Sequence, residues 1–194
     1  MEKKRKSIIS KAKTKYSERT HKFGIEVPKN VKDAKRIDSE NSNTLWQDAI
    51  ALEMKNVRIA FEVFEGHIRE LENYKHIAGH LIFDIKLGEN FRRKARFVAD
   101  GYKASAPNAI TYSSVASRDS MRLFLLVAAL NDIEIRSADV QNAFLTEPVL
   151  ETVWLVAGPE FGPEQGKNMI VVRALYGLKS ASALFRSFMA KKLD

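Results

Sequence analysis

The most informative segment of this 194-residue chain reads IEIRSADVQNAF, from Ile133 to Phe144. Residue character alternates from Ile133 to Ala138, and this period of two predicts a strand that ends at Asp139. A carboxylate at a strand end, followed five residues later by the aromatic Phe144, suits a metal ligand beside a nucleotide pocket. Aspartates also end strands as simple turn formers, so Asp139 alone leaves both interpretations open.

A second motif, LYGLK from Leu175 to Lys179, places a glycine next to an aromatic residue. Tyr176-Gly177 suits a turn in which the missing side chain lets a base pair or a backbone approach closely. A tight turn before the last helix, with Tyr176 simply packed, explains the same residues equally well.

The segment between residues 81 and 99 predicts a β-hairpin. Apolar and polar residues alternate from Leu81 to Leu87, and they alternate again from Phe91 to Ala99. Gly88-Glu89-Asn90 supplies turn chemistry between the two runs.

The second strand of this hairpin is expected to place Arg92, Lys94 and Arg96 on one face, because side chains alternate across a strand. The opposite face is expected to carry Phe91, Ala95 and Phe97. Three cations in a row repel one another, which favours an anionic partner, and Arg offers a planar fork for phosphate oxygens. The alternative is a solvated strand face that is balanced by Glu89 or Asp100.

Other segments predict further helices and strands. The apolar stripe of a first helix is formed by Trp46, Ile50, Met54, Val57 and Phe61. The segment Met121–Leu130 is apolar nearly all round and is expected to be a buried helix, capped by Asp119 or Ser120. Strands are expected at Val153–Val156 and Met169–Arg173, and a final amphipathic helix at Ala181–Met189. This order of mixed elements predicts an α+β domain.

Composition limits the possible function classes. The formal net charge is +8, and residues 1–44 carry most of it, with 13 Lys and Arg against 6 Asp and Glu. Binding by the folded part must therefore be judged on local patches. The chain has no cysteine and no long apolar run, which excludes disulfides and thiolate metal sites and fits an intracellular protein, cytoplasmic or nuclear. The four histidines form no recognised metal-ligand pattern, and a P-loop is absent.

Five blocks of sequence, taken in order, resemble the reverse transcriptase of Ty1/copia-type retrotransposons. The blocks are Trp46–Ile50 with Glu53-Met54, Lys94–Gly101, Ser120–Arg122, Ala138–Leu145 and Arg173–Lys179. The resemblance covers roughly His21 to Asp194. The family has a glutamine after the LYGLK motif where this chain has Ser180, so the function of that amide does not transfer.

The resemblance implies the fingers and the start of the palm of a right-hand polymerase, in truncated form. Residues 1–43 are expected to be a basic, disordered linker, with ordered structure beginning near Thr44. Residues 44–194 would be the N-terminal portion of the reverse transcriptase domain, with fingers at about 44–131 and palm from about 132. Lys3-Lys4-Arg5-Lys6 also fits a nuclear-localisation signal.

The resemblance also implies RNA-directed DNA synthesis with two Mg²⁺ ions, deoxynucleoside triphosphates and an RNA or DNA primer–template. Asp139 would supply a bridging carboxylate, and the backbone carbonyl of Val140 a further oxygen. Lys94 and Arg96 would hold the incoming triphosphate. Phe144 would exclude a ribose 2′-hydroxyl, although an ordinary core aromatic is the alternative.

The remaining implied contacts involve nucleic acid. Tyr176 and Gly177 would lie beside the templating base pair, and Arg92 and Lys179 would contact phosphates. The family's later Asp-Asp pair does not occur before Asp194, so the chain alone is expected to be catalytically inactive. It would then be one part of a retrotransposon polyprotein. The second hypothesis is a non-catalytic nucleic-acid-binding relict that uses the basic tail and the Arg92/Lys94/Arg96 face.

Overall fold

The computed structural model describes residues 21–193, except for positions 89, 106 and 110. The predictions for the first 20 residues, a disordered segment and a nuclear-localisation signal, lie outside the described residues. The described part combines three small sheets with helices, so its fold is α+β, as expected. None of its helices has both the length and the apolar content needed to cross a membrane.

Ordered structure begins well before Thr44, so the predicted starting point was wrong. Strands β1 (His21–Lys22) and β2 (Ile25–Glu26) form a short hairpin, and α2 (Val31–Glu40) follows it. Helix α2 buries one face against α3 (Leu45–Val57), and the buried residues of that face are Val31, Ala34, Ile37 and Asp38. The basic composition of residues 1–43 did not reveal that this segment contains an amphipathic helix.

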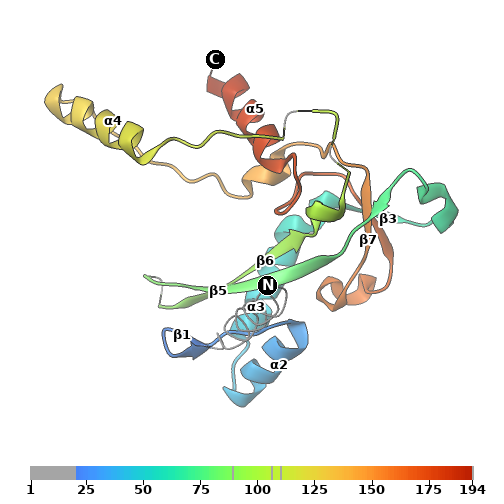
Figure 1. Ribbon diagram of the computed structural model, residues 1–194. Helices are drawn as coiled ribbons and strands as arrows, with labels where there is room; N and C mark the ends of the chain where they lie inside the picture. The colour runs from blue at the N-terminus through green and yellow to red at the C-terminus, as the bar shows by residue number, and fades with distance from the viewer. Residues whose placement is uncertain (1–20, 89, 106, 110, 194) are drawn as a thin grey trace, which may run out of the picture.

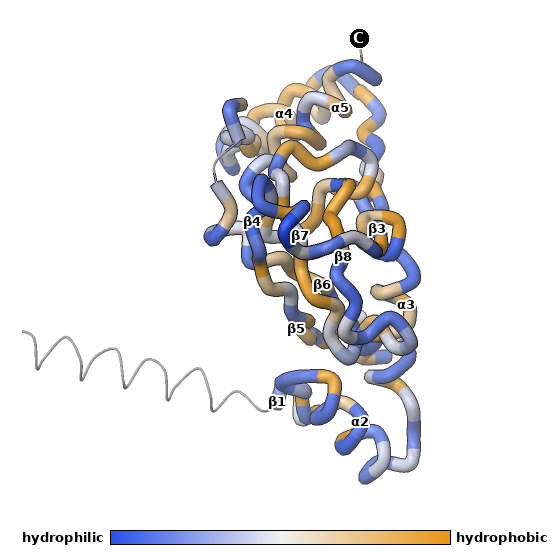
Figure 2. The backbone as a smooth tube through the Cα atoms, turned by 90° about the vertical axis from the view of Figure 1, so that its right-hand side faces the viewer, coloured by the Kyte–Doolittle hydropathy of each residue, from blue (hydrophilic) through white to orange (hydrophobic). Residues whose placement is uncertain are grey.

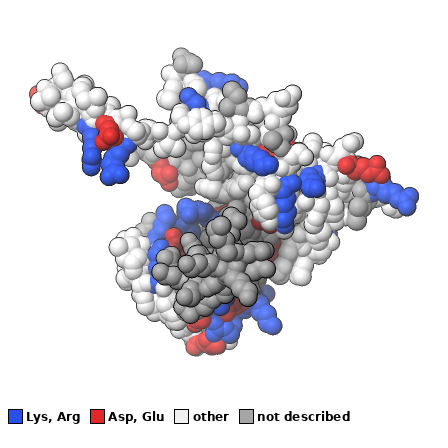
Figure 3. Space-filling model, in the orientation of Figure 1, with Lys and Arg blue, Asp and Glu red and all other residues white. Residues whose placement is uncertain are grey.

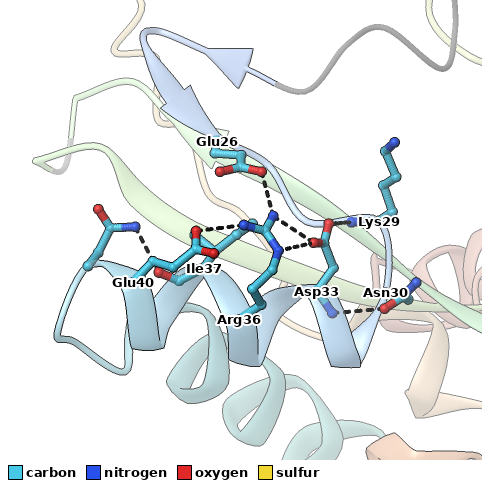
Figure 4. A network of polar contacts seen from close by, with 8 residues as sticks. Glu26, Lys29, Asn30, Asp33, Arg36, Ile37 and Glu40 are labelled. Atoms are coloured by element: carbon cyan, nitrogen blue, oxygen red, sulfur yellow. Dashed lines mark hydrogen bonds and ion pairs between the residues drawn. The ribbon is translucent and has the colours of Figure 1, made fainter.

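Two polar networks fix α2 in place. The buried carboxylate of Asp38 accepts hydrogen bonds from the backbone N–H groups of Trp46 (3.1 Å) and Gln47 (2.9 Å), which caps the first turn of α3. On the solvent side, the guanidinium of Arg36 binds three carboxylates, those of Glu26, Asp33 and Glu40 (Figure 4). The second network ties the β1–β2 hairpin to α2.

The predicted central hairpin is confirmed as β5 (Gly79–Lys86) and β6 (Arg92–Ala99), which pair antiparallel along their whole length (Figure 1). Its inner face packs against α3, where the rings of Trp46 and Phe83 meet edge to face at 5.7 Å. The predicted inner-face position of Phe91 was wrong. Asn90 and Phe91 have positive φ angles of 50° and 55° in the turn, which breaks the alternation and leaves Phe91 exposed.

A four-stranded sheet lies beside the hairpin in the order β3-β8-β7-β4. Its strands are β3 (Phe61–Phe64), β8 (Asn168–Val171), β7 (Val153–Val156) and β4 (Lys75–His76). Only β4 and β7 pair in parallel among these strands. Edge-to-face contacts among Phe61, Phe97 and Phe161, at 5.1–5.6 Å, join this sheet to the hairpin in one core.

Short 3-10 helices connect these elements, and a final helix follows the last strand. The 3-10 helices are η1 (Arg58–Ala60), η2 (Ile68–Leu71), η3 (Gly101–Lys103), η4 (Ala143–Thr146) and η5 (Pro159–Glu164). The predicted last helix is confirmed as α5 (Ala181–Leu193). Helix α3 ends at Val57, so Phe61 lies in a strand and not in the first helix as predicted.

Helix α4 (Arg118–Leu130) exists as predicted, but the prediction that it is buried was wrong. It extends away from the body of the molecule (Figure 1), and Ala128 is its only buried residue. Leu123, Phe124 and Leu126 are each more than half exposed. The cap is Ser117, whose hydroxyl accepts a hydrogen bond from the backbone N–H of Ser120 at 3.0 Å. An all-round apolar sequence indicates burial only where another element covers it, and no described element covers α4.

The strand predicted at residues 133–138 is also absent from the described structure. Residues 133–140 are irregular and exposed. Alternation shows that a segment can pair in a sheet, but a strand forms only with a hydrogen-bonded neighbour. This segment has no such neighbour among the described residues, so Asp139 ends no strand here.

Candidate functional site

The outer face of the β5–β6 hairpin is a row of cations, as predicted from the period of the strand. Arg92, Lys94 and Arg96 lie on this face, whereas Ala95 and Phe97 are buried on the other. The residues opposite the three cations in the ladder are Lys86, Asp84 and Ile82, respectively. Figure 3 shows Lys and Arg side chains gathered on the part of the molecule that faces the α4 arm.

Two acidic residues, Glu89 and Asp100, were predicted as the residues that balance the row of cations, and the structure describes only Asp100. Glu89 lies outside the described residues, and Asp100 binds His80 (3.1 Å) and Lys103 (3.2 Å) instead. The acidic side chain on this face is Asp84, which forms an ion pair with Lys22. This ion pair is the main reason why the pKa of Asp84 is lowered.

Glu53 on α3 is a site residue that reasoning from the sequence missed. Its carboxylate accepts a hydrogen bond from the backbone N–H of Phe97 at 2.9 Å, at the edge of β6 that faces away from β5. Burial raises the pKa of Glu53, although the nearby charges of Lys94 and Arg96 oppose this shift. The only signal in the sequence was that Glu53 belongs to the family-like block that begins at Trp46. Membership of a sequence block does not show which residue a side chain contacts.

Lys94 lies among other cations and is partly buried. Partial burial lowers its pKa, and the positive charges of Arg96 and Lys86 lower it further. The crowding of like charges that the sequence predicted is therefore present in the fold. A bound polyanion would relieve it.

Three predicted site residues from distant segments meet at one aromatic cluster. The ring of Phe144 packs edge to face on Tyr176 at 4.7 Å, and the guanidinium carbon of Arg96 lies 5.7 Å from the centroid of the Tyr176 ring. Phe185 on α5 also packs edge to face on Phe144, with ring centroids 6.3 Å apart. The cluster links the cationic face of β6 to η4 and to the LYGLK turn.

Gly177 lets the LYGLK turn dock against the end of β6. Its φ is +92°, and a Cβ atom there would lie 2.0 Å from the carbonyl oxygen of Ala99. The carbonyl of Tyr176 accepts a hydrogen bond from the N–H of Ala99 at 2.8 Å. The close approach that the sequence predicted is therefore made by the backbone of β6.

The residues after Gly177 are held by polar contacts. Lys179 donates to the carbonyl of Ala104 at 2.6 Å, so in this structure its ammonium is used within the protein. At the position of the family's glutamine, buried Ser180 donates its N–H (2.8 Å) and its hydroxyl (2.6 Å) to the carboxylate of Glu151. This pair fixes the start of α5.

The structure does not bring Asp139 into contact with the cationic face. Asp139 and Val140 are exposed in the irregular segment before η4. Within the described residues, no hydrogen bond or ion pair engages the Asp139 carboxylate, and no group of three or more His, Asp or Glu side chains could hold a metal ion. Asp139 is connected to the aromatic cluster along the chain, because Phe144 follows it five residues later.

The comparisons with known proteins agree on one family. Residues 66–194 match the family model described as reverse transcriptase (RNA-dependent DNA polymerase). The chain is 38% identical over 94 residues to the "Retrovirus-related Pol polyprotein from transposon RE1" of Arabidopsis thaliana, and 36% identical over 94 residues to that from transposon RE2.

Each of these two matches covers 46% of this chain and 6% of the relative. No solved structure is significantly similar to the chain. The family model, however, covers well over half of the residues, and its match includes β6, the LYGLK turn and the Asp139 segment. The chain therefore belongs to the reverse transcriptase (RNA-dependent DNA polymerase) family and represents its Ty1/copia retrotransposon type.

Proposed function

We propose that this chain forms the nucleotide-contacting part of an RNA-directed DNA polymerase, with the β5–β6 hairpin in the fingers and residues from about 132 onward in the palm. The observation that carries the proposal is the Arg96–Tyr176–Phe144 cluster. It joins a cationic side chain, a turn that is docked on β6 and an aromatic ring suited to contact a sugar. Since α2 packs on α3, we include residues 21–43 in the same folded domain.

In this proposal each site residue has one role. Lys94 and Arg96 bind the phosphates of the incoming nucleotide, Arg96 being positioned by the Tyr176 ring. Tyr176 and Gly177 border the templating base pair, and Arg92 contacts a phosphate of the nucleic acid. Lys179 can reach a phosphate only by releasing the Ala104 carbonyl.

The residues available for a metal fit Mg²⁺ in chemistry but not in number. The Asp139 carboxylate and the Val140 carbonyl would hold the ion, since Mg²⁺ prefers hard oxygen ligands, and no described side chain competes for the Asp139 carboxylate. When bound, two such ions supply activation of the primer hydroxyl and charge neutralisation of the triphosphate. One carboxylate leaves most of the charge of two ions uncompensated, so we propose that the 194-residue chain alone does not extend a primer.

Replacing either cation of the phosphate-binding pair is expected to weaken binding of a labelled RNA–DNA primer–template. Lys94→Ala or Arg96→Ala should each reduce affinity about five- to tenfold at low salt, and reduce the slope of log K against log salt by about one. Fluorescence anisotropy over a salt series measures both quantities. Lys35→Ala, which removes an exposed cation from α2, is the matched control. Equal effects of all three variants would show that only net charge matters.

Phe144→Ala is expected to raise ribonucleotide incorporation in a longer polypeptide that extends primers. The smaller side chain no longer meets a ribose 2′-hydroxyl, so discrimination between the two sugars should fall at least about tenfold. Single-nucleotide extension with dNTP and rNTP measures the ratio of kcat/KM. Phe185→Ala controls for loosening of the cluster, because Phe185 also packs on Phe144 but has no proposed contact with the sugar. Unchanged sugar discrimination would remove Phe144 from the pocket.

A second candidate is a non-catalytic nucleic-acid-binding module, which would use the Arg92/Lys94/Arg96 face of the hairpin on phosphates. Primer-extension assays on the 194-residue chain and on a longer polypeptide, taken together, separate the candidates, and extension by the 194-residue chain itself would contradict the proposed inactivity. Binding without extension fits both the inactive polymerase part and the module. Extension restored in a longer polypeptide supports the polymerase alone.

A further inference from the structure

The N-terminal hairpin contacts the cationic hairpin directly, although it lies outside the residues that match the family model. The ammonium of Lys22 forms an ion pair with Asp84, 62 positions later in the chain. Beside this ion pair, the rings of Phe23 and Phe91 pack with centroids 6.0 Å apart. Two contacts of different chemistry therefore hold β1–β2 against the turn of β5–β6.

Both aromatic residues sit in an unusual backbone conformation. Phe23 has a φ of 53° and Phe91 a φ of 55°, in the left-handed region that bulky residues rarely adopt. Each ring lies in a strained turn, and the two turns meet through their rings. Contacts that hold two such turns together indicate a specific docking arrangement.

Asp84 holds a particular place in the ladder. The outer face of the hairpin is formed by His80, Ile82, Asp84 and Lys86 on β5 and by Arg92, Lys94, Arg96 and Val98 on β6. Asp84 is the only acid in that set, and its direct cross-strand partner is Lys94. Cross-strand neighbours of opposite charge normally attract one another. In this structure, however, the Asp84 carboxylate is bound by Lys22 and by the N–H of Ile85 at 2.8 Å.

We propose that Lys22 is a positioning residue for phosphate binding: it occupies the Asp84 carboxylate and so keeps Lys94 and Arg96 open to an anion. The N-terminal hairpin then contributes to phosphate binding, because it supplies Lys22. Without Lys22, the Asp84 carboxylate turns to Lys94 across the strands and competes with the ligand. This inference rests on the proposed role of Lys94 and Arg96, and it adds a role for a segment that the family match leaves out.

A double-mutant cycle on the 194-residue chain tests the proposal, with affinity for a labelled RNA–DNA primer–template measured by anisotropy. Lys22→Met should weaken binding about fivefold, more than Lys35→Met does, and Asp84→Ala should strengthen binding about twofold. The double variant should bind like Asp84→Ala alone, because Lys22 acts through Asp84. Competition with tripolyphosphate distinguishes a triphosphate subsite from contact with the nucleic-acid backbone. At a triphosphate subsite, the inhibition constants of tripolyphosphate should change across the variants in the same way as the dissociation constants of the primer–template. At a contact with the backbone alone, they should not.

Two results overturn the inference, and they are distinguishable. If Lys22→Met weakens binding equally with Asp84 present or absent, Lys22 contacts the nucleic acid independently, and the positioning role is wrong. If Lys94→Ala and Arg96→Ala leave affinity unchanged, the proposed phosphate site itself is wrong and the inference falls with it. Both residues of the ion pair are partly exposed, so the variants should fold, and circular dichroism checks this.

Discussion

Asp139→Asn is expected to abolish primer extension by a longer polypeptide that carries the full set of catalytic carboxylates. The rate should fall at least about a thousandfold. When several residues act as a unit on the reacting groups, replacing one of them costs nearly as much activity as replacing all of them. Affinity for the primer–template should change less than about twofold, since the exposed Asp139 forms no ion pair with the cationic face among the described residues. Single-turnover extension and anisotropy measure the two quantities.

The control for Asp139→Asn is Glu134→Gln, which removes another exposed carboxylate from the same irregular segment. Glu134 is paired with Arg136 at 3.1 Å and has no proposed role. Its replacement should leave extension within about twofold of the parent. Equal losses in both variants would indicate a general need for negative charge on the segment, and full activity of Asp139→Asn would end the catalytic assignment.

Gly177→Ala is expected to cost about 3 kcal/mol of unfolding free energy, or to detach the LYGLK turn. The new methyl group would lie 2.0 Å from the Ala99 carbonyl oxygen and 2.9 Å from Val98 Cγ1, and the φ of +92° adds strain. Urea unfolding followed by circular dichroism measures the loss. Primer–template affinity should also fall, because Tyr176 no longer supports Arg96.

Gly166→Ala separates the two expected causes of the stability loss, the steric clash with β6 and the backbone strain at positive φ. Gly166 has a φ of +85°, but a Cβ atom there would meet nothing within 4 Å. This variant should cost only about 1 kcal/mol, which is the contribution of backbone strain. If both variants lose the same stability, the clash with β6 does not occur and the docking of the turn is wrong.

The hairpin face was predictable because it depends on local geometry. A strand has a fixed period of two, so the sequence alone placed Lys94 and Arg96 together and Phe97 opposite them. The same reasoning failed at Phe91, where a turn with positive φ ended the period. It also failed to show Lys22, because an ion pair across 62 positions leaves no periodic signal.

The errors at α4 and at residues 133–138 have a common cause. An apolar pattern reports what a segment can pack against, whereas burial and strand pairing depend on a second element. The α4 arm is apolar in sequence (Figure 2) yet exposed in the described structure. The meeting of Phe144, Tyr176 and Arg96 was likewise unpredictable, because it depends on how a turn and a 3-10 helix fold back onto β6.

The regular rise of β6 sets the distance over which its cations act. Residues two apart on a strand are separated by about 7 Å, so Arg92, Lys94 and Arg96 extend over about 14 Å. The phosphates of one nucleoside triphosphate form a shorter chain, which spans two neighbouring cations of the row but not all three. In the proposed function, an incoming nucleotide and a backbone phosphate would therefore bind next to each other along the strand.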